Sequence, residues 1–226
     1  MSRFLGRGAG LMACSALLCF PHDPITTKLT WTQEVSRIVY KRCAGCHRPG
    51  GAAMSLLTYE EARPWAKAIR DEVLARRMPP WGAVKGIGDF TGDPSLSTPE
   101  IEMLIAWVEG GAPEGDPVYL PHRIPASAPN DVPLPRYSRT VAVSHEATLA
   151  QAGKLIAVRP KNLLDRESLE AWAVLPDGSV DRLIWLHDYR KVWTRDYVLR
   201  EPLTLPAGSR LRVESAPNAS LALYFQ

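Results

Sequence analysis

The residues of this chain best suited to chemistry are two cysteines and a histidine in the run Cys43-Ala44-Gly45-Cys46-His47. Two thiols separated by two residues can add to the two vinyl groups of a haem, and the histidine that follows can then bind the iron. The spacing therefore predicts one covalent haem c, held by Cys43 and Cys46, with His47 as an axial ligand of the iron.

Other uses of a Cys-x-x-Cys pair fit the surrounding sequence less well. A zinc ribbon needs a second pair of ligands, and no cysteine follows Cys46. A thioredoxin-like redox pair follows a strand and opens a helix, whereas here a helix is expected before Cys43 and a glycine-rich stretch after the motif. A plain disulfide leaves His47 without a role.

The second axial ligand is predicted to be Met78, in the run Met78-Pro79-Pro80-Trp81. The two prolines fix the backbone just after Met78, so its sulfur can be held toward the iron. A thioether ligand favours the ferrous state and suits electron transfer. Met54 is another candidate for this second ligand, and it follows His47 by only seven residues. Alternatively, Met78 packs in a hydrophobic core and binds no iron. Further candidate ligands are His22, His122, His145 and His187.

Three helical segments are expected to position these residues. Thr30 or Thr32 can cap a helix that ends as it reaches Cys43. Thr98 is expected to cap the last helix, which stops at Gly110.

The middle helix is expected to begin at the run Thr58-Tyr59-Glu60-Glu61, which has the pattern of a capping box. Because a proline breaks a continuous helix, Pro64 is expected to separate a short turn from a helix over about residues 64–77. The apolar stripe expected to be buried on this segment consists of Ala62, Trp65, Ile69 and Val73.

The second half of the chain has a different pattern. Prolines recur from Pro113 to Pro135, which favours a linker or an irregular wrap over a helix. Beyond them lie short segments rich in Val, Leu, Ile and aromatic residues, and the turn Pro176-Asp177-Gly178-Ser179 joins two of them. Short strands with regular turns predict an antiparallel β-sandwich. The expected strands are residues 139–143, 154–159, 168–175, 180–186, 197–203 and 210–213.

The first twenty residues and the net charge indicate where the protein is located and which partners it can bind. Residues 1–20 combine two arginines with a short apolar run, as in a secretory signal segment, and Cys14 resembles the cysteine of a lipoprotein box. No apolar run is long enough to span a membrane, so only a lipid anchor at Cys14 is expected to bind one. The formal charge of +3 is too balanced for a nucleic-acid-binding protein. The expected location is periplasmic or exported, either free or as a membrane-anchored lipoprotein.

The first half resembles bacterial mono-haem class I cytochrome c domains. The likeness rests on Cys-x-x-Cys-His followed by Pro49-Gly50-Gly51, the run at 57–62, Met78-Pro79-Pro80-Trp81 and a closing run at 107–113. In that family the methionine of the Met-Pro-Pro motif is the distal ligand, which implies Met78 here.

The second half is similar to the C-terminal domain of copper type II, ascorbate-dependent monooxygenases. The likeness covers the runs at 175–179, 183–189 and 202–210. Those relatives carry a His-x-His pair where this chain has Lys161, Asn162 and Leu163. A lysine repels a copper ion and a leucine offers no donor, so the copper ligands are expected to be lost.

Together these features predict a multidomain fold, with an all-α cytochrome c domain followed by an all-β antiparallel sandwich. The expected parts are a signal segment at 1–20, a haem domain at 29–116, a proline-rich linker at 117–136 and the sandwich at 137–226. The predicted function is electron transfer to or from a redox partner protein. The alternatives are a haem-based sensor or docking module that uses the sandwich, and a haem- or copper-type oxygenase. Cations near the motifs can either steer an acidic partner or be ordinary solvated charges: Arg42, Arg48, Arg76, Arg77 and Lys85.

Overall fold

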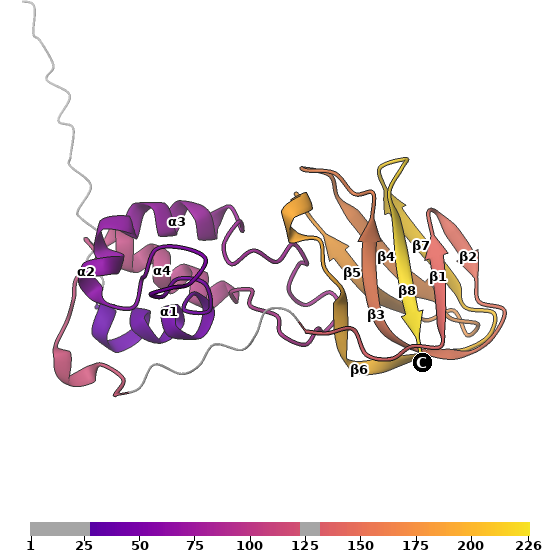
Figure 1. The fold of residues 1–226 in the computed structure, drawn as a ribbon, viewed down its shortest axis with the longest axis horizontal. Helices are drawn as coiled ribbons and strands as arrows, with labels where there is room; N and C mark the ends of the chain where they lie inside the picture. The colour runs from indigo at the N-terminus through magenta and orange to yellow at the C-terminus, as the bar shows by residue number, and fades with distance from the viewer. Residues whose placement is uncertain (1–27, 123–131) are drawn as a thin grey trace, which may run out of the picture.

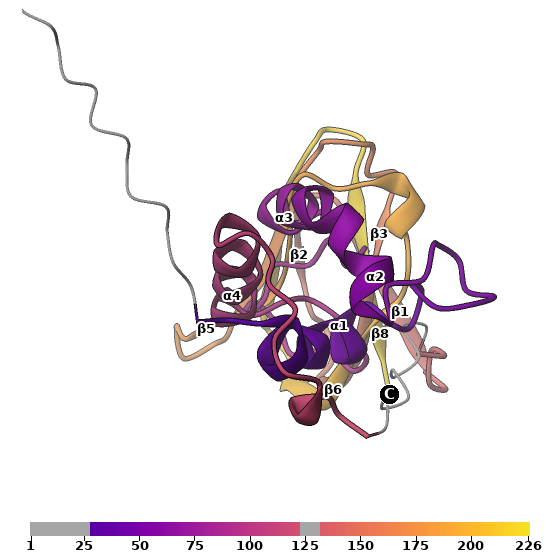
Figure 2. The ribbon, with the colours of Figure 1, turned by 90° about the vertical axis from the view of Figure 1, so that its left-hand side faces the viewer.

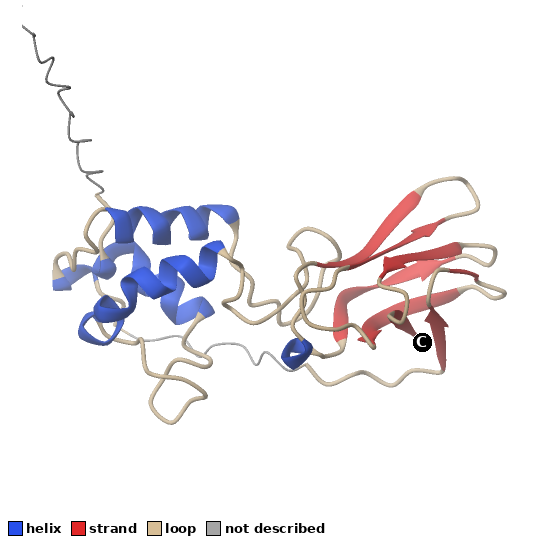
Figure 3. Ribbon diagram, turned by 90° about the horizontal axis from the view of Figure 1, so that it is seen from above, coloured by secondary structure: helices blue, strands red, loops and turns tan. Residues whose placement is uncertain are grey.

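The computed structural model describes residues 28–122 and 132–226. The first of these ranges contains the four α-helices and the second contains the eight strands, and the two groups lie side by side along the long axis of the molecule (Figure 1). Seen from above, irregular segments join the helices to the sheets (Figure 3). The α-helices are α1 (Ser36–Arg42), α2 (Tyr59–Ala62), α3 (Ala66–Leu74) and α4 (Thr98–Glu109).

The first and last helices begin at side chains that cap them. A turn of π-helix at Trp31–Val35 leads into α1, and the Thr30 side chain accepts a hydrogen bond from the backbone of Gln33, so the predicted cap is confirmed. The cap of α4 is Ser97 rather than the predicted Thr98. Ser97 and Glu100 form a reciprocal capping box, a motif that has a glutamate or a glutamine three residues after the cap.

The middle segment follows the predicted break. Thr58 and Glu61 form a capping box at the start of α2, and Pro64 sits in a short 3₁₀ turn, Arg63–Trp65, that separates α2 from α3. The helices then pack around two tryptophans, Trp31 and Trp107, whose rings lie 6.1 Å apart between centroids and are almost fully buried. Figure 2 views these helices end on, with α1 to α4 around a common centre.

The prediction of an all-α first domain is wrong. The four α-helices have only 7, 4, 9 and 12 residues, and long stretches between them are irregular. Glycines and prolines cause this, because residues 45–51 and 79–94 are rich in both and cannot continue a helix. Most of the regular secondary structure in residues 28–122 and 132–226 is therefore β-sheet.

Two four-stranded antiparallel sheets make up the second half. One has the strand order β1-β8-β3-β6 and the other β2-β7-β4-β5. In Figure 1, β8 lies between β1 and β3 in the first sheet. The strands are β1 (Arg139–Val143), β2 (Glu146–Thr148), β3 (Gly153–Lys161), β4 (Leu169–Val174), β5 (Val180–Leu186), β6 (Tyr197–Leu205), β7 (Arg210–Ser215) and β8 (Ser220–Phe225).

The six predicted strands are confirmed, and two more were missed. Strand β2 has only three residues. Strand β8 lies inside its sheet and is buried at nearly every position, so it has no alternation of polar and apolar residues to mark it.

An irregular segment of the first half packs on the sheets. Trp81 and Phe90 belong to the hydrophobic core of the strands, and Phe90 pairs with Leu199 of β6 through an isolated bridge. The Tyr197 hydroxyl donates a 2.6 Å hydrogen bond to the Trp81 carbonyl, and the two rings lie 5.0 Å apart. Residues within the predicted haem domain at 29–116 therefore help to build the sandwich core. The boundary between the predicted haem domain and the predicted sandwich is not tested by this contact and remains a prediction.

Several predictions lie outside the described residues: the signal segment at 1–20, Cys14, His22 and the part of the linker at 123–131. After that gap, Val132 and Leu134 pack on the outer side of the first sheet, which supports an irregular wrap for this part of the linker. Within the described ranges, no helix is both long and apolar enough to cross a membrane.

Candidate functional site

The predicted site residues line one cavity in the helical half. Its volume is about 310 Å³, and its wall includes Cys43, Cys46, His47 and Met78. Helix α1 ends directly before the Cys-x-x-Cys-His motif, so it positions Cys43 at the cavity. Residues of α3 form a second wall, and Met78 lies in the segment that follows α3. The other lining residues are mainly apolar: Arg42, Ala52, Ala53, Met54, Leu56, Trp65, Ala68, Ile69, Glu72, Val73, Pro79 and Pro80.

The loop after the motif folds back tightly on it. The backbone N–H groups of Ala53 and Leu56 donate to the carbonyls of Cys46 and His47, at 3.2 and 3.3 Å. A Cβ atom at Gly51 would lie 2.3 Å from the Cys46 carbonyl oxygen, so only glycine allows this approach. The glycine-rich stretch noted in the sequence therefore closes the loop around His47.

His47 is oriented by this loop. Its Nδ1 lies 3.0 Å from the carbonyl oxygen of Met54. Because a carbonyl can only accept a hydrogen bond, Nδ1 is the donor in this contact, and in the neutral ring this leaves the lone pair on Nε2. Fixing one ring nitrogen in this way is how proteins prepare the other nitrogen to bind a metal.

The two cysteines are reduced thiols that are not joined to each other. Burial, together with the neighbouring Cys46 and Glu100, raises the pKa of the Cys43 thiol to about 12, and Arg42 lowers it only in part. A thiol-exchange enzyme instead needs a cysteine whose pKa is lowered. The surroundings of Cys43 thus suit a neutral thiol or thioether better than a reactive thiolate.

Three large apolar side chains at this cavity are exposed to an unusual degree. Met54 is 45% exposed, Trp65 is 45% exposed and Met78 is 41% exposed. Large apolar groups gathered at one concave place mark a surface that binds a partner or ligand. The sequence placed Trp65 on a buried stripe, and the structure corrects this, because Trp65 faces the cavity instead of the core.

The structure brings some of the candidate ligands together and separates others. Both Met78 and Met54 line the cavity with His47, so both positions remain compatible with a ligand role. His187 lines a second, neighbouring cavity, and His122 and His145 line neither of the two. No group of three or more His, Cys, Asp or Glu side chains in residues 28–122 and 132–226 is placed to hold a metal ion.

An ion pair holds the end of α1 next to the start of α4. Arg42 Nε and Nη2 donate to the two carboxylate oxygens of Glu100, at 3.0 and 3.1 Å. Both side chains are only 13% exposed. Burial alone would raise the pKa of Glu100, but hydrogen bonds from Arg42 and Ser97 outweigh it and hold the pKa below its ordinary value. Because Arg42 directly precedes Cys43, this pair positions the motif.

The cations noted in the sequence are largely paired with acids. Besides Arg42, Arg77 Nη2 lies 2.7 Å from Glu72 Oε1, and Lys85 Nζ lies 2.9 Å from Asp93 Oδ2. Such pairs reduce the positive field that would steer an acidic partner.

Two residues at the position where the resemblance predicted lost copper ligands belong to the sandwich itself. Lys161 is the exposed last residue of β3, and Leu163 is buried in the core between the sheets.

A scan against protein-family models and a search of curated proteins found no match for this chain.

Proposed function

We propose that this chain is an exported electron-transfer protein that carries one covalent haem c. The observation that carries the proposal is that Cys43, Cys46, His47 and Met78 line the same largely apolar cavity. The four residues come from two separate parts of the sequence, so their meeting is a property of the fold and not of the local motif.

The residues at this cavity fit such a group. The thiols of Cys43 and Cys46 are available for two thioether bonds, and the Met54 carbonyl leaves His47 Nε2 to bind iron. The exposed apolar side chains of Met54, Trp65 and Met78 offer the surface that a porphyrin would cover. When bound, haem supplies a one-electron couple between ferric and ferrous iron.

Residues of the cavity would control the polarity around the haem iron and its reduction potential. Leu56, Ile69 and Val73 give the cavity apolar walls, which exclude water and lower the local dielectric. The Met78 thioether is the proposed second axial ligand, and a ligand of this kind raises the reduction potential. With both axial positions filled by side chains, no substrate needs to bind iron. The proposed partner is therefore a redox protein that approaches the open side of the cavity.

The assignment of the axial ligands is tested by spectroscopy on the full chain made in a host that exports it and matures c-type haem. Reduced-minus-oxidised spectra should show one low-spin c-type haem. His47→Ala should abolish the low-spin spectrum, and His145→Ala, a change at a histidine outside the cavity, should leave it unchanged.

The rival methionines are compared in the same way. Met78→Ala should remove the weak far-red band of a ferric iron bound to a thioether, and Met54→Ala should keep it. If the untreated ferrous protein binds carbon monoxide, the second axial position is open, and electron transfer through a six-coordinate iron is refuted. In that case a haem-based sensor becomes the better description.

A further inference from the structure

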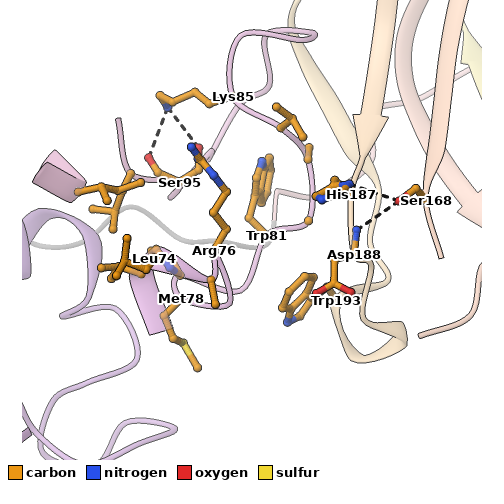
Figure 4. Close-up of a pocket in the computed structure, with 18 of the residues that line it drawn as sticks. Leu74, Arg76, Met78, Trp81, Lys85, Ser95, Ser168, His187, Asp188 and Trp193 are labelled. Carbon is orange, nitrogen blue, oxygen red and sulfur yellow. Dashed lines mark hydrogen bonds between the residues drawn. The ribbon is translucent and has the colours of Figure 1, made fainter. Parts of the chain in front are cut away.

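A second cavity lies where the helical half meets the sheets. Its volume is about 570 Å³, and residues from both halves line it. Figure 4 shows Arg76, Lys85 and Ser95 on the helical side and Ser168, His187 and Asp188 on the sheet side. This volume lies within the usual range for cavities that bind small molecules.

Backbone strain is concentrated at this cavity. Five residues other than glycine have a positive φ in the described chain, and three of them line this wall. They are Arg76 at 52°, Arg166 at 68° and Asp188 at 45°. Such conformations cost free energy in residues with a Cβ atom and gather at ligand-binding places, where the fold holds a side chain in a required position. All three of these residues are charged.

The charges at the cavity are mainly positive. Lys85 is neutralised by Asp93, and its ammonium group also donates to Ser95. Arg166 and Asp188 face each other at 3.7 Å, but the Arg166 side chain is 71% exposed, so this pair is weak. Arg76 therefore adds a positive charge that no acid lining this cavity offsets at ion-pair distance.

Part of the cavity wall is aromatic and apolar. Trp81 and Trp193 stand between the helical side and the sheet side in Figure 4. Pro79, Val84 and Leu96 add further apolar surface. A small inorganic anion would leave these walls without contacts, whereas an aromatic carboxylate would fill them and place its charge near arginine.

We propose that this cavity binds a small aromatic carboxylate, with Arg76 as the principal cation and Arg166 as a second. The wall formed by Met78 and Pro79 is shared with the cavity around Cys43, so the ligand would lie next to the proposed haem site. The carboxylate site itself does not depend on haem.

The site is tested by isothermal titration calorimetry on the full chain with benzoate, indole-3-acetate and 2-naphthoate. At least one should bind with a stoichiometry of one, and its neutral alcohol analogue and inorganic phosphate should bind at least about tenfold more weakly. Absence of binding by all three carboxylates, or equal binding of the acid and its alcohol, would overturn the proposal.

Variants assign the cations without disturbing the backbone. Arg76→Asn and Arg166→Asn remove a charge but keep a residue that tolerates a positive φ, so both proteins should unfold at or above the wild-type temperature. Arg76→Asn should weaken carboxylate binding at least about tenfold, and Arg166→Asn should weaken it less. Arg136→Asn removes an exposed arginine that lines neither cavity and should bind like wild type. Wild-type affinity in both cavity variants would refute the proposed role of the arginines. Calorimetry needs no haem, so a negative result here leaves the haem proposal standing.

Discussion

Replacing Glu100 by glutamine tests how the cysteine motif is positioned. The change keeps the size of the side chain and its ability to serve in the capping box at Ser97, but it removes the negative charge that faces Arg42. The Arg42 guanidinium would then stay 13% exposed with no full charge to balance it.

The cost follows from this burial. Removing one partner of a fully buried pair costs about 3–5 kcal/mol, and an exposed pair is worth about 0–1 kcal/mol. The Arg42–Glu100 pair is mostly buried and makes two charged hydrogen bonds, so we expect Glu100→Gln to lower the free energy of unfolding by about 2–3 kcal/mol. Urea unfolding at pH 7 measures this difference. The matched control is Asp89→Asn, which breaks a pair with Arg200 whose side chains are 72% and 56% exposed and should cost less than about 0.5 kcal/mol.

The same pair predicts a dependence on pH. The pKa of Glu100 is lower in the folded state than in the unfolded chain, so its ionised form favours folding. The stabilisation is complete above the unfolded pKa of about 4.3 and is lost as the pH falls through the lower folded value. The difference between wild type and Glu100→Gln should therefore shrink as the pH falls below about 4.3 and through the lower folded pKa of Glu100. A difference below about 0.5 kcal/mol at pH 7, or one that does not change in acid, would show that the Arg42–Glu100 pair does not stabilise the fold in this way.

Other substitutions probe the packing around the site, all measured by urea unfolding. Trp81→Ala should cost about 3–5 kcal/mol, because it empties part of the core between Phe90 and Tyr197, and a cost under about 1 kcal/mol would mean that the segment does not pack on the sheets. Tyr197→Phe should cost about 1–2 kcal/mol by leaving the buried Trp81 carbonyl without its donor, and stability equal to wild type would contradict the 2.6 Å hydrogen bond. Thr58→Ala should cost about 1 kcal/mol by removing the cap of α2, whereas Thr58→Ser should be nearly neutral.

Elements that depend on local sequence, such as strands and turns, were predicted most accurately. Strands β1 and β5 were predicted with the bounds that the structure has, and the Asp177-Gly178 turn marked the hairpin before β5. Strand β8 was missed because an interior strand buried on both faces has no alternation. The cap of α4 was placed one residue late, although Glu100 lies at the capping-box distance from Ser97 and could have identified it.

Long-range packing was not predictable in this way. Nothing near Trp81 in the sequence indicates that its partner is Tyr197, which lies on a strand more than a hundred residues later. The all-α prediction was wrong for a related reason. Caps and stripes locate helices, but they do not show that long irregular segments rich in glycine and proline fill the space between them. At the candidate site, the motif identified Cys43 and His47, whereas only the fold shows that Trp65 is exposed at the cavity.

The intact mass of the exported chain tests the central proposal most directly, when the chain is produced together with the machinery that attaches c-type haem. Covalent attachment at both cysteines predicts an added mass of one haem that survives denaturation and is absent from the Cys43→Ala/Cys46→Ala variant. An unmodified wild-type chain under these conditions would contradict covalent haem attachment, and with it the proposed electron transfer.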